Sequence, residues 1–269
     1  MGPPNANHLR VGDLLARSVR IYLRNFLPFL PIAAIAYAPW LLLELWSPMV
    51  EDTTMATLIW FGWAVVEESC HFVLAGVLSI AVVQQLRGRA TVHDLTRGLH
   101  AVPPALGAAV LAAVRVQMWI LLGTLLAQWS AYMGTIYLAL LSFPLWILAL
   151  LQVLRLFVTM PASVLEKRTA LAALRRSAQL TKGVRGPIFG AWLMLMAAQL
   201  LVMQALGYLL VDNVDVMFPL RFYLLPQWIT ATVKVVFAPL MATAMATAWF
   251  LLRRSVDQVD ADDIAAVFD

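Results

Sequence analysis

The stretch LIWFGWAVVEESCHFVLAGVLSIAVV, from Leu58 to Val83, decides the fold class of this chain. It is long enough to cross a bilayer, because about 20 helical residues cover the ~30 Å hydrocarbon layer. Within it lie two adjacent carboxylates, Glu67 and Glu68, and one imidazole, His71. Charged groups at membrane depth usually face other helices or a wet cavity. The stretch therefore predicts a membrane helix with a polar site on one of its sides.

Stretches of similar length and hydropathy recur along the 269 residues. Six of them qualify as spans: Phe26 to Trp46, Leu58 to Val83, Ala105 to Trp129, Thr135 to Met160, Ile188 to Val211, and Trp228 to Leu252. The composition agrees, since 62% of the residues are hydrophobic and 13% are charged, against ~25% charged in a soluble domain. This excludes an ordinary soluble enzyme and predicts an all-α integral membrane protein with six transmembrane helices.

The placement of basic residues predicts the orientation. Fifteen of the nineteen lie in four segments that fall on one side of a six-span protein: the N-terminus, residues 87–97, residues 167–185, and the pair Arg253-Arg254. The opposite connections hold Glu51, Asp52, Asp212 and Asp215 but a single base, Arg221. By the positive-inside rule both termini are cytoplasmic. We expect a multi-pass protein of the bacterial inner membrane, with residues 255–269 as an acidic cytoplasmic tail.

A short motif recurs at intervals of 80 and 79 residues. Its copies are Leu15-Ala16-Arg17-Ser18, Leu95-Thr96-Arg97-Gly98 and Leu174-Arg175-Arg176-Ser177. Each copy lies in a short basic amphipathic segment ahead of two spans. Such helices are too short and too charged to span and favour the membrane interface. We expect Arg17, Arg97 and Arg176 to face anionic headgroups there.

The repeat predicts an architecture of three transmembrane hairpins, each preceded by an interfacial helix. The units are about 9–88, 89–167 and 168–254, within a single membrane domain, 1–254. Parallel repeats are related by rotation about the membrane normal, so a pseudo-threefold bundle is the expected arrangement. The alternative is three unrelated juxtamembrane helices, which look alike because all of them obey the positive-inside rule.

The segment from Arg155 to Gly190 adds a family resemblance. It carries Arg155, Pro161, Glu166, Ala173-Leu174-Arg175-Arg176-Ser177, Leu180-Thr181-Lys182-Gly183 and Phe189-Gly190. This pattern resembles the membrane-domain family attached to some bacterial glycerophosphodiester phosphodiesterases, which also occurs as stand-alone membrane proteins. The resemblance implies a membrane module without an activity, because the family's chemistry resides in a separate soluble barrel. We expect no such barrel here, since 15 residues follow Arg254 and a barrel needs roughly 200.

Five ionisable residues inside the spans form the candidate site: Glu67, Glu68, His71, Arg115 and Lys234. Their depths predict that Glu68 pairs with Lys234 and that Arg115 neutralises Glu67. Such a cluster has two interpretations. It lines a polar cavity for an ion, a proton or a headgroup, or it only locks helices together. Arg155, near the cytoplasmic boundary, is expected to snorkel or to pair with Glu166.

No cofactor or metal is predicted. Glu68 and His71 have the E-x-x-H spacing of carboxylate di-iron sites, but a second such motif and further glutamates are missing. Phosphate-binding glycine loops, HExxH and GxSxG are also absent from the sequence. The expected partners are the bilayer and its anionic headgroups, with a membrane protein or a second copy as a further option and no nucleic acid.

The sequence favours one function over two others. The first is a non-catalytic inner-membrane protein that organises or regulates membrane components or lipids. The alternative is a small-solute or ion permease whose pathway passes the intramembrane acid–base cluster. A membrane-embedded enzyme is third, because no candidate nucleophile has a neighbouring base. Whether the cluster is dry or opens to one side separates these hypotheses.

Overall fold

A computed structural model describes residues 10–45, 53–87, 93–209 and 219–256, and within these ranges the chain is helical without strands. Six helices are long and apolar enough to cross a membrane: Phe26–Glu44, Met55–Leu86, Pro103–Met133, Ala139–Leu165, Arg185–Gly207 and Gln227–Val256. The prediction of an all-α protein with six membrane-spanning helices is confirmed at this level. The predicted acidic connections and most of the tail lie outside the described residues.

The long helices follow the predicted spans closely. They are α2 (Phe26–Leu45), α3 (Thr53–Leu86), α5 (Leu106–Met133), α6 (Ile136–Leu156), α9 (Arg185–Gly207) and α10 (Pro219–Val256). Shorter helices precede or follow them: α1 (Val11–Arg24), α4 (His93–Ala101), η1 (Pro103–Ala105), α7 (Thr159–Leu165) and α8 (Ala170–Leu180). Prolines inside α2 and α6 interrupt neither helix, as membrane helices allow.

The fourth span contains a break that the sequence did not predict. The candidate span Ala139–Leu165 includes Met160, but within it α6 ends at Leu156 and α7 begins at Thr159. Val158 has a non-helical backbone, with φ −108° and ψ 20°. Its N–H group donates to Ser177 Oγ of α8 at 3.3 Å. The hydroxyl of α8 thus satisfies a backbone group that the break releases.

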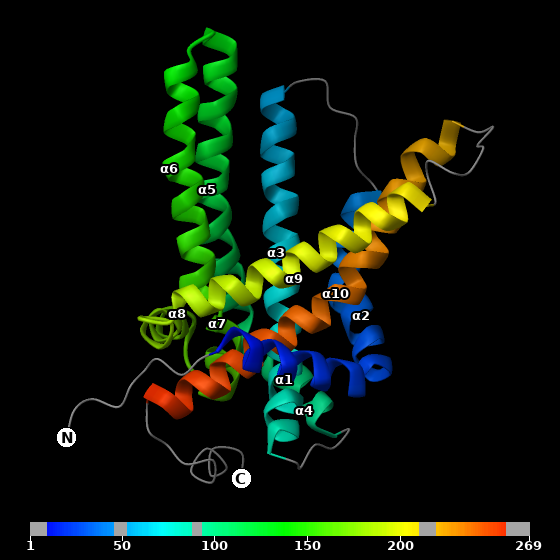
Figure 1. The fold of residues 1–269 in the computed structure, drawn as a ribbon, viewed down its shortest axis with the longest axis vertical. Helices are drawn as coiled ribbons and strands as arrows, with labels where there is room; N and C mark the ends of the chain where they lie inside the picture. The colour runs from blue at the N-terminus through cyan, green and yellow to red at the C-terminus, as the bar shows by residue number, and fades with distance from the viewer. Residues whose placement is uncertain (1–9, 46–52, 88–92, 210–218, 257–269) are drawn as a thin grey trace.

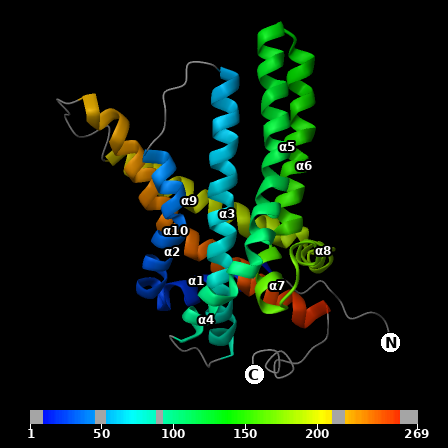
Figure 2. The same ribbon diagram turned by 180° about the vertical axis from the view of Figure 1, so that it is seen from behind.

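The long helices are not all parallel (Figures 1 and 2). Helices α3, α5 and α6 stand upright, whereas α9 and α10 run diagonally across them. Helices α5 and α6 lie side by side as an antiparallel pair, joined at Gly134 in the left-handed conformation (φ 64°). The three predicted hairpins therefore differ in packing, and the repeat with its pseudo-threefold symmetry stays a prediction.

Burial divides the molecule into two halves. In the closed half, nearly every side chain of residues 70–83 in α3 and 238–252 in α10 is buried, and α1, α4, α7 and α8 lie around them. In the open half, residues 55–68 of α3 and the distal parts of α5, α6 and α9 are mostly half-buried or exposed. Helix α3 passes from one half into the other, and its polar residues lie at the transition.

Candidate functional site

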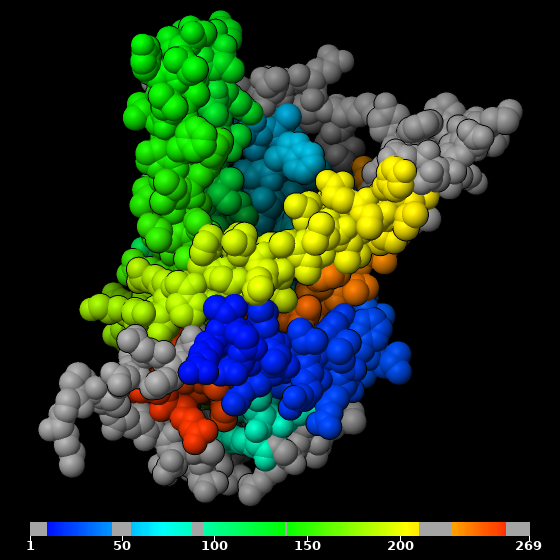
Figure 3. Space-filling model, in the orientation of Figure 1, coloured from blue at the N-terminus to red at the C-terminus, as the bar shows by residue number. Residues whose placement is uncertain are grey.

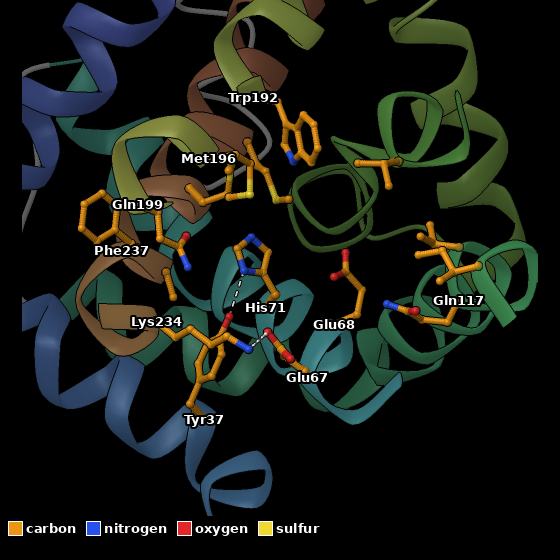
Figure 4. A pocket seen from close by; sticks show the side chains of 16 residues that line it. Tyr37, Glu67, Glu68, His71, Gln117, Trp192, Met196, Gln199, Lys234 and Phe237 are labelled. Carbon is orange, nitrogen blue, oxygen red and sulfur yellow. Dashed lines mark hydrogen bonds and ion pairs between the residues drawn. The ribbon is translucent and has the colours of Figure 1, made fainter. Parts of the chain in front are cut away.

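A cavity of about 260 Å³ lies where the closed half meets the open half. Helix α3 contributes Glu67, Glu68 and His71 to its wall, and α10 contributes Lys234. Spacings of three and four residues place the imidazole on the same side of α3 as the two carboxylates. The structure thus brings four of the five predicted residues together (Figure 4).

The ion pair in the cavity is not the expected one. Lys234 Nζ lies 2.7 Å from Glu67 Oε1, so Lys234 pairs with Glu67 and not with Glu68. The Lys234 ammonium also lies over the Trp40 ring, 4.4 Å from its centroid, which adds a cation–π contact. Both charged side chains remain partly accessible, at 25% for Lys234 and 33% for Glu67. Neighbouring residues of a helix differ by about 100° in direction, so only one of the two carboxylates faces α10.

The histidine is held by a tyrosine from α2. Tyr37 Oη lies 2.9 Å from His71 Nδ1, and Tyr37 is only 3% exposed. Its ring packs edge-on against Trp40, with centroids 6.1 Å apart. This contact fixes the imidazole at the edge of the cavity, with its second ring nitrogen left for another partner.

Glu68 is the carboxylate without a partner. Its side chain projects into the space between His71, Gln117 and Trp192 (Figure 4). Within the part of the chain that the structure describes, Glu68 makes no ion pair or hydrogen bond. Because Lys234 already balances Glu67, the described lining carries one uncompensated acidic group. The cavity is therefore suited to a proton, a cation or a hydrogen-bond donor.

Uncharged polar groups complete the lining. Gln117 of α5 and Gln199 of α9 face the same cavity as Glu68, together with Trp192 and Met196 of α9. The sequence prediction missed these residues and Tyr37. Amides inside apolar spans were the available signal, because a buried amide needs hydrogen-bond partners.

Arg115 does not belong to the cavity. It lies in α5, but its side chain is exposed and it does not line the space around Glu67. The expected Arg115–Glu67 neutralisation is therefore wrong. The buried face of α5 is formed by small residues instead, among them Ala112, Ala113 and Val116, and these turn Arg115 outward.

The cavity opens between two groups of helices. In the space-filling view, the molecule is hollowed between the α5–α6 pair and α9, and α3 is visible at the bottom of this hollow (Figure 3). Toward the other end, Phe72, Leu74 and Met241 are at most 4% exposed. The polar site is therefore reached from the side of the open half, while the closed half is packed.

A second carboxylate occupies the closed half. Glu166 follows α7, and its side chain is 6% exposed. It accepts hydrogen bonds from Arg168 Nε at 2.6 Å, Arg176 Nε at 3.1 Å and Trp249 Nε1 at 3.1 Å. This corrects two expectations. Arg176 turns inward to Glu166 rather than outward to lipid, and Arg155 is not the partner of Glu166.

The other two repeat arginines differ from Arg176. Arg17 in α1 and Arg97 in α4 are exposed. Helix α1 buries Leu14, Ser18, Ile21 and Tyr22 and leaves its bases outside. The three motif copies therefore do not place their arginines in equivalent surroundings.

The described residues contain no group of three or more His, Cys, Asp or Glu side chains that could hold a metal ion. Comparisons with protein-family models, curated proteins and solved structures found no match to this chain.

Proposed function

We propose that this chain is a non-catalytic, multi-pass protein of the bacterial inner membrane, which binds an amine-bearing membrane component and thereby organises or regulates lipids. The observation that carries the proposal is the unpartnered Glu68 carboxylate in a cavity that opens sideways between α5–α6 and α9. A ligand that resides in the bilayer reaches such an opening without crossing the packed closed half.

The size and chemistry of the cavity favour a headgroup. A volume of about 260 Å³ lies below the ~300–1,000 Å³ of sites for whole drug-sized ligands. An ammonium group would donate to Glu68 and to the amide oxygens of Gln117 and Gln199, and the Trp192 ring would contribute a cation–π contact. A primary amine on a lipid headgroup fits these donor and acceptor positions.

The remaining features of the proposal concern the membrane setting. Helices α1, α4 and α8 lie at the basic end of the molecule and would rest in the cytoplasmic interface, with exposed bases such as Arg17, Arg97 and Arg175 among anionic headgroups. Both termini would then be cytoplasmic. The resemblance of the segment from Arg155 to Gly190 to the glycerophosphodiester phosphodiesterase membrane domains supports the same picture of a membrane module.

Lipid titration tests the proposal. In nanodiscs of phosphatidylcholine, added phosphatidylethanolamine should raise the thermal midpoint of the wild-type protein and change its tryptophan fluorescence. Glu68→Gln should lose this response, because the amide has no charge for the ammonium. Glu44→Gln is the matched control, since Glu44 does not line the cavity. An equal response of wild type and Glu68→Gln would overturn the proposal.

A permease is the second candidate, favoured by one observation. The Glu67–Lys234 pair and the free Glu68 cluster within candidate spans, as in proton or ion pathways. A permease predicts flux of protons or small cations across proteoliposomes that disappears in Glu68→Gln. Flux in the wild type would replace the binding proposal, whereas its absence together with the lipid response would support binding alone.

A further inference from the structure

Two arginines of the spans face away from the cavity. Arg115 in α5 and Arg155 in α6 are both exposed, and neither guanidinium forms an ion pair within the described parts of the chain. The carboxylate beside α8, Glu166, is already engaged by Arg168, Arg176 and Trp249. The two exposed cations therefore require a partner from outside the fold.

The register of the α5–α6 pair places both arginines at one level. A Cβ atom at Gly123 would lie 3.4 Å from Leu145 Cβ, so these residues face each other across the pair. Arg115 is eight residues from Gly123, and Arg155 is ten residues from Leu145. At 1.5 Å per residue, these separations are about 12 and 15 Å along the antiparallel axes. The two side chains thus begin within about 3 Å of the same height.

The same pair places both arginines on one side. Val116 and Ala149 are buried, at 2% and 4% exposure, and mark the inner faces of α5 and α6. At about 100° per residue, Arg115 is offset by about −100° from Val116, and Arg155 by about −120° from Ala149. Because the helices run in opposite directions, offsets of equal sign carry both side chains to the same face of the pair.

Helix α8 fixes the depth of that face. Ser177 Oγ donates to the Arg155 carbonyl at 2.9 Å, and the Cβ of Ala170 lies 3.7 Å from the position of a Cβ at Gly107. Helix α8 therefore contacts α6 at Arg155 itself and α5 at Gly107, about 12 Å along the axis from Arg115. In the proposed interfacial position of α8, on which this step rests, the Ser177 end of α8 puts the level that both arginines share near the lipid phosphates.

We propose that Arg115 and Arg155 form a binding site for the phosphate of an anionic phospholipid, on the outer face of the α5–α6 pair above α8. Each guanidinium offers two parallel N–H donors, the geometry that suits phosphate oxygens. Phosphatidylglycerol, whose phosphate carries a single negative charge, is the probe of choice.

Native mass spectrometry of the full chain, released from nanodiscs with equal phosphatidylglycerol and phosphatidylcholine, tests the site. We expect retention of phosphatidylglycerol over phosphatidylcholine in the wild type. Removing one basic group near the surface should reduce the preference about fivefold, so Arg115→Gln and Arg155→Gln should each lose about that much. Arg254→Gln is the matched control, because it removes an equally exposed arginine from the end of α10, outside the helices proposed to lie among the headgroups.

Further variants and a competition with inorganic phosphate distinguish the possible results of this experiment. The double variant Arg115→Gln/Arg155→Gln should lose most of the preference. If it fails to fold, Arg115→Lys/Arg155→Lys takes its place, because it keeps the charge but loses the forked donors and should retain only part of the preference. Inorganic phosphate at millimolar concentration should not displace the lipid, and displacement would indicate a free-phosphate site instead. An unchanged preference in both single glutamine variants, or an equal loss in Arg254→Gln, would overturn the lipid site while leaving the Glu68 proposal untouched.

Discussion

Glu166 and Glu68 are two carboxylates in opposite surroundings of one chain. Glu166 lies in the closed half, is 6% exposed, and accepts hydrogen bonds from two arginines and a tryptophan. Glu68 lies at the edge of the open half and has no hydrogen-bonding or ionic partner in the described residues. A satisfied buried charge network rigidifies the fold. A carboxylate without a partner beside a cavity can still pair with a cationic ligand or accept hydrogen bonds from it.

The contrast between Glu166 and Glu68 also separates the two interpretations of a charge inside the membrane, as a lock between helices or as part of a binding site. The Glu166 network joins the α7–α8 connection to α8 and α10, so it serves as the structural lock that a buried ion pair often is. The lock that was expected between Glu68 and Lys234 instead uses Glu67, which leaves Glu68 unengaged. The structural role thus falls to Glu166 and Glu67, and the ligand-binding role to Glu68. Mutations of these glutamates should therefore change the free energy of unfolding by different amounts.

The largest effect is expected at Glu166. Glu166→Gln preserves the side-chain volume but leaves the Arg176 guanidinium, 14% exposed, without its counterion. Breaking a buried pair in this way lowers the free energy of unfolding by about 3 kcal/mol. Reversible unfolding in mixed detergent measures it.

Arg168→Gln is the control for this change. Its side chain is 42% exposed, and solvent screening limits the loss to about 1 kcal/mol. Equal losses in Glu166→Gln and Arg168→Gln would mean that the Glu166 network is not a buried lock, and the comparison with Glu68 would fail.

A glycine tests how tightly the closed half is packed. A Cβ at Gly98 of α4 would lie 2.1 Å from the Val77 carbonyl oxygen of α3, and a backbone atom cannot move aside easily. Gly98→Ala should therefore displace α4 and lower the free energy of unfolding by about 1–3 kcal/mol.

Gly62→Ala provides the matched change in the open half. No atom lies within 4 Å of a Cβ there, and alanine is the better helix former, by up to about 1 kcal/mol. We expect this variant to be as stable as the wild type or more so. Destabilisation by Gly62→Ala that equals the Gly98→Ala effect would contradict the division into a closed and an open half.

The effect expected at Lys234 is smaller than that at Glu166 and larger than that at Glu68. Because its ion pair with Glu67 is partly accessible, Lys234→Met should cost about 1 kcal/mol of unfolding free energy. A double-mutant cycle identifies the partner. Lys234→Met combined with Glu67→Gln should be non-additive, whereas its combination with Glu68→Gln should be additive. The opposite result would restore the Glu68–Lys234 pair.

The hydropathy of the sequence predicted the six long helices, because each needs only a run of about 20 apolar residues. It did not predict the break between α6 and α7, since Leu156, Phe157 and Val158 are all apolar and the hydroxyl that compensates the break comes from Ser177. Composition reveals which segments enter the membrane. It does not reveal where a neighbouring helix supplies a hydrogen bond.

The residues of the site were predicted more fully than their pairing. Glu67, Glu68, His71 and Lys234 do surround one cavity, as charges at membrane depth suggest. The choice between two adjacent glutamates depends on a rotation of about 100°, which the depth of a residue does not determine. Arg115 shows the same limit, because its depth was compatible with Glu67 while the packing of α5 turns it outward.

The smallest effect on stability is expected at Glu68 itself. Glu68→Gln has the same shape as the wild type and breaks no hydrogen bond or ion pair in the described structure. In detergent without lipid, its free energy of unfolding should therefore differ from that of the wild type by no more than about 0.5 kcal/mol. A ligand that binds only the folded state raises the unfolding free energy by RT ln(1 + [L]/Kd), so at an amine-lipid concentration of 100 Kd the wild type should gain about 2.7 kcal/mol and Glu68→Gln should gain much less. Unfolding measured with and without phosphatidylethanolamine separates the intrinsic stability of each variant from the stabilisation by bound lipid. A loss near that of Glu166→Gln in the lipid-free measurement would make Glu68 a structural residue, and the unpartnered carboxylate would no longer indicate a binding site.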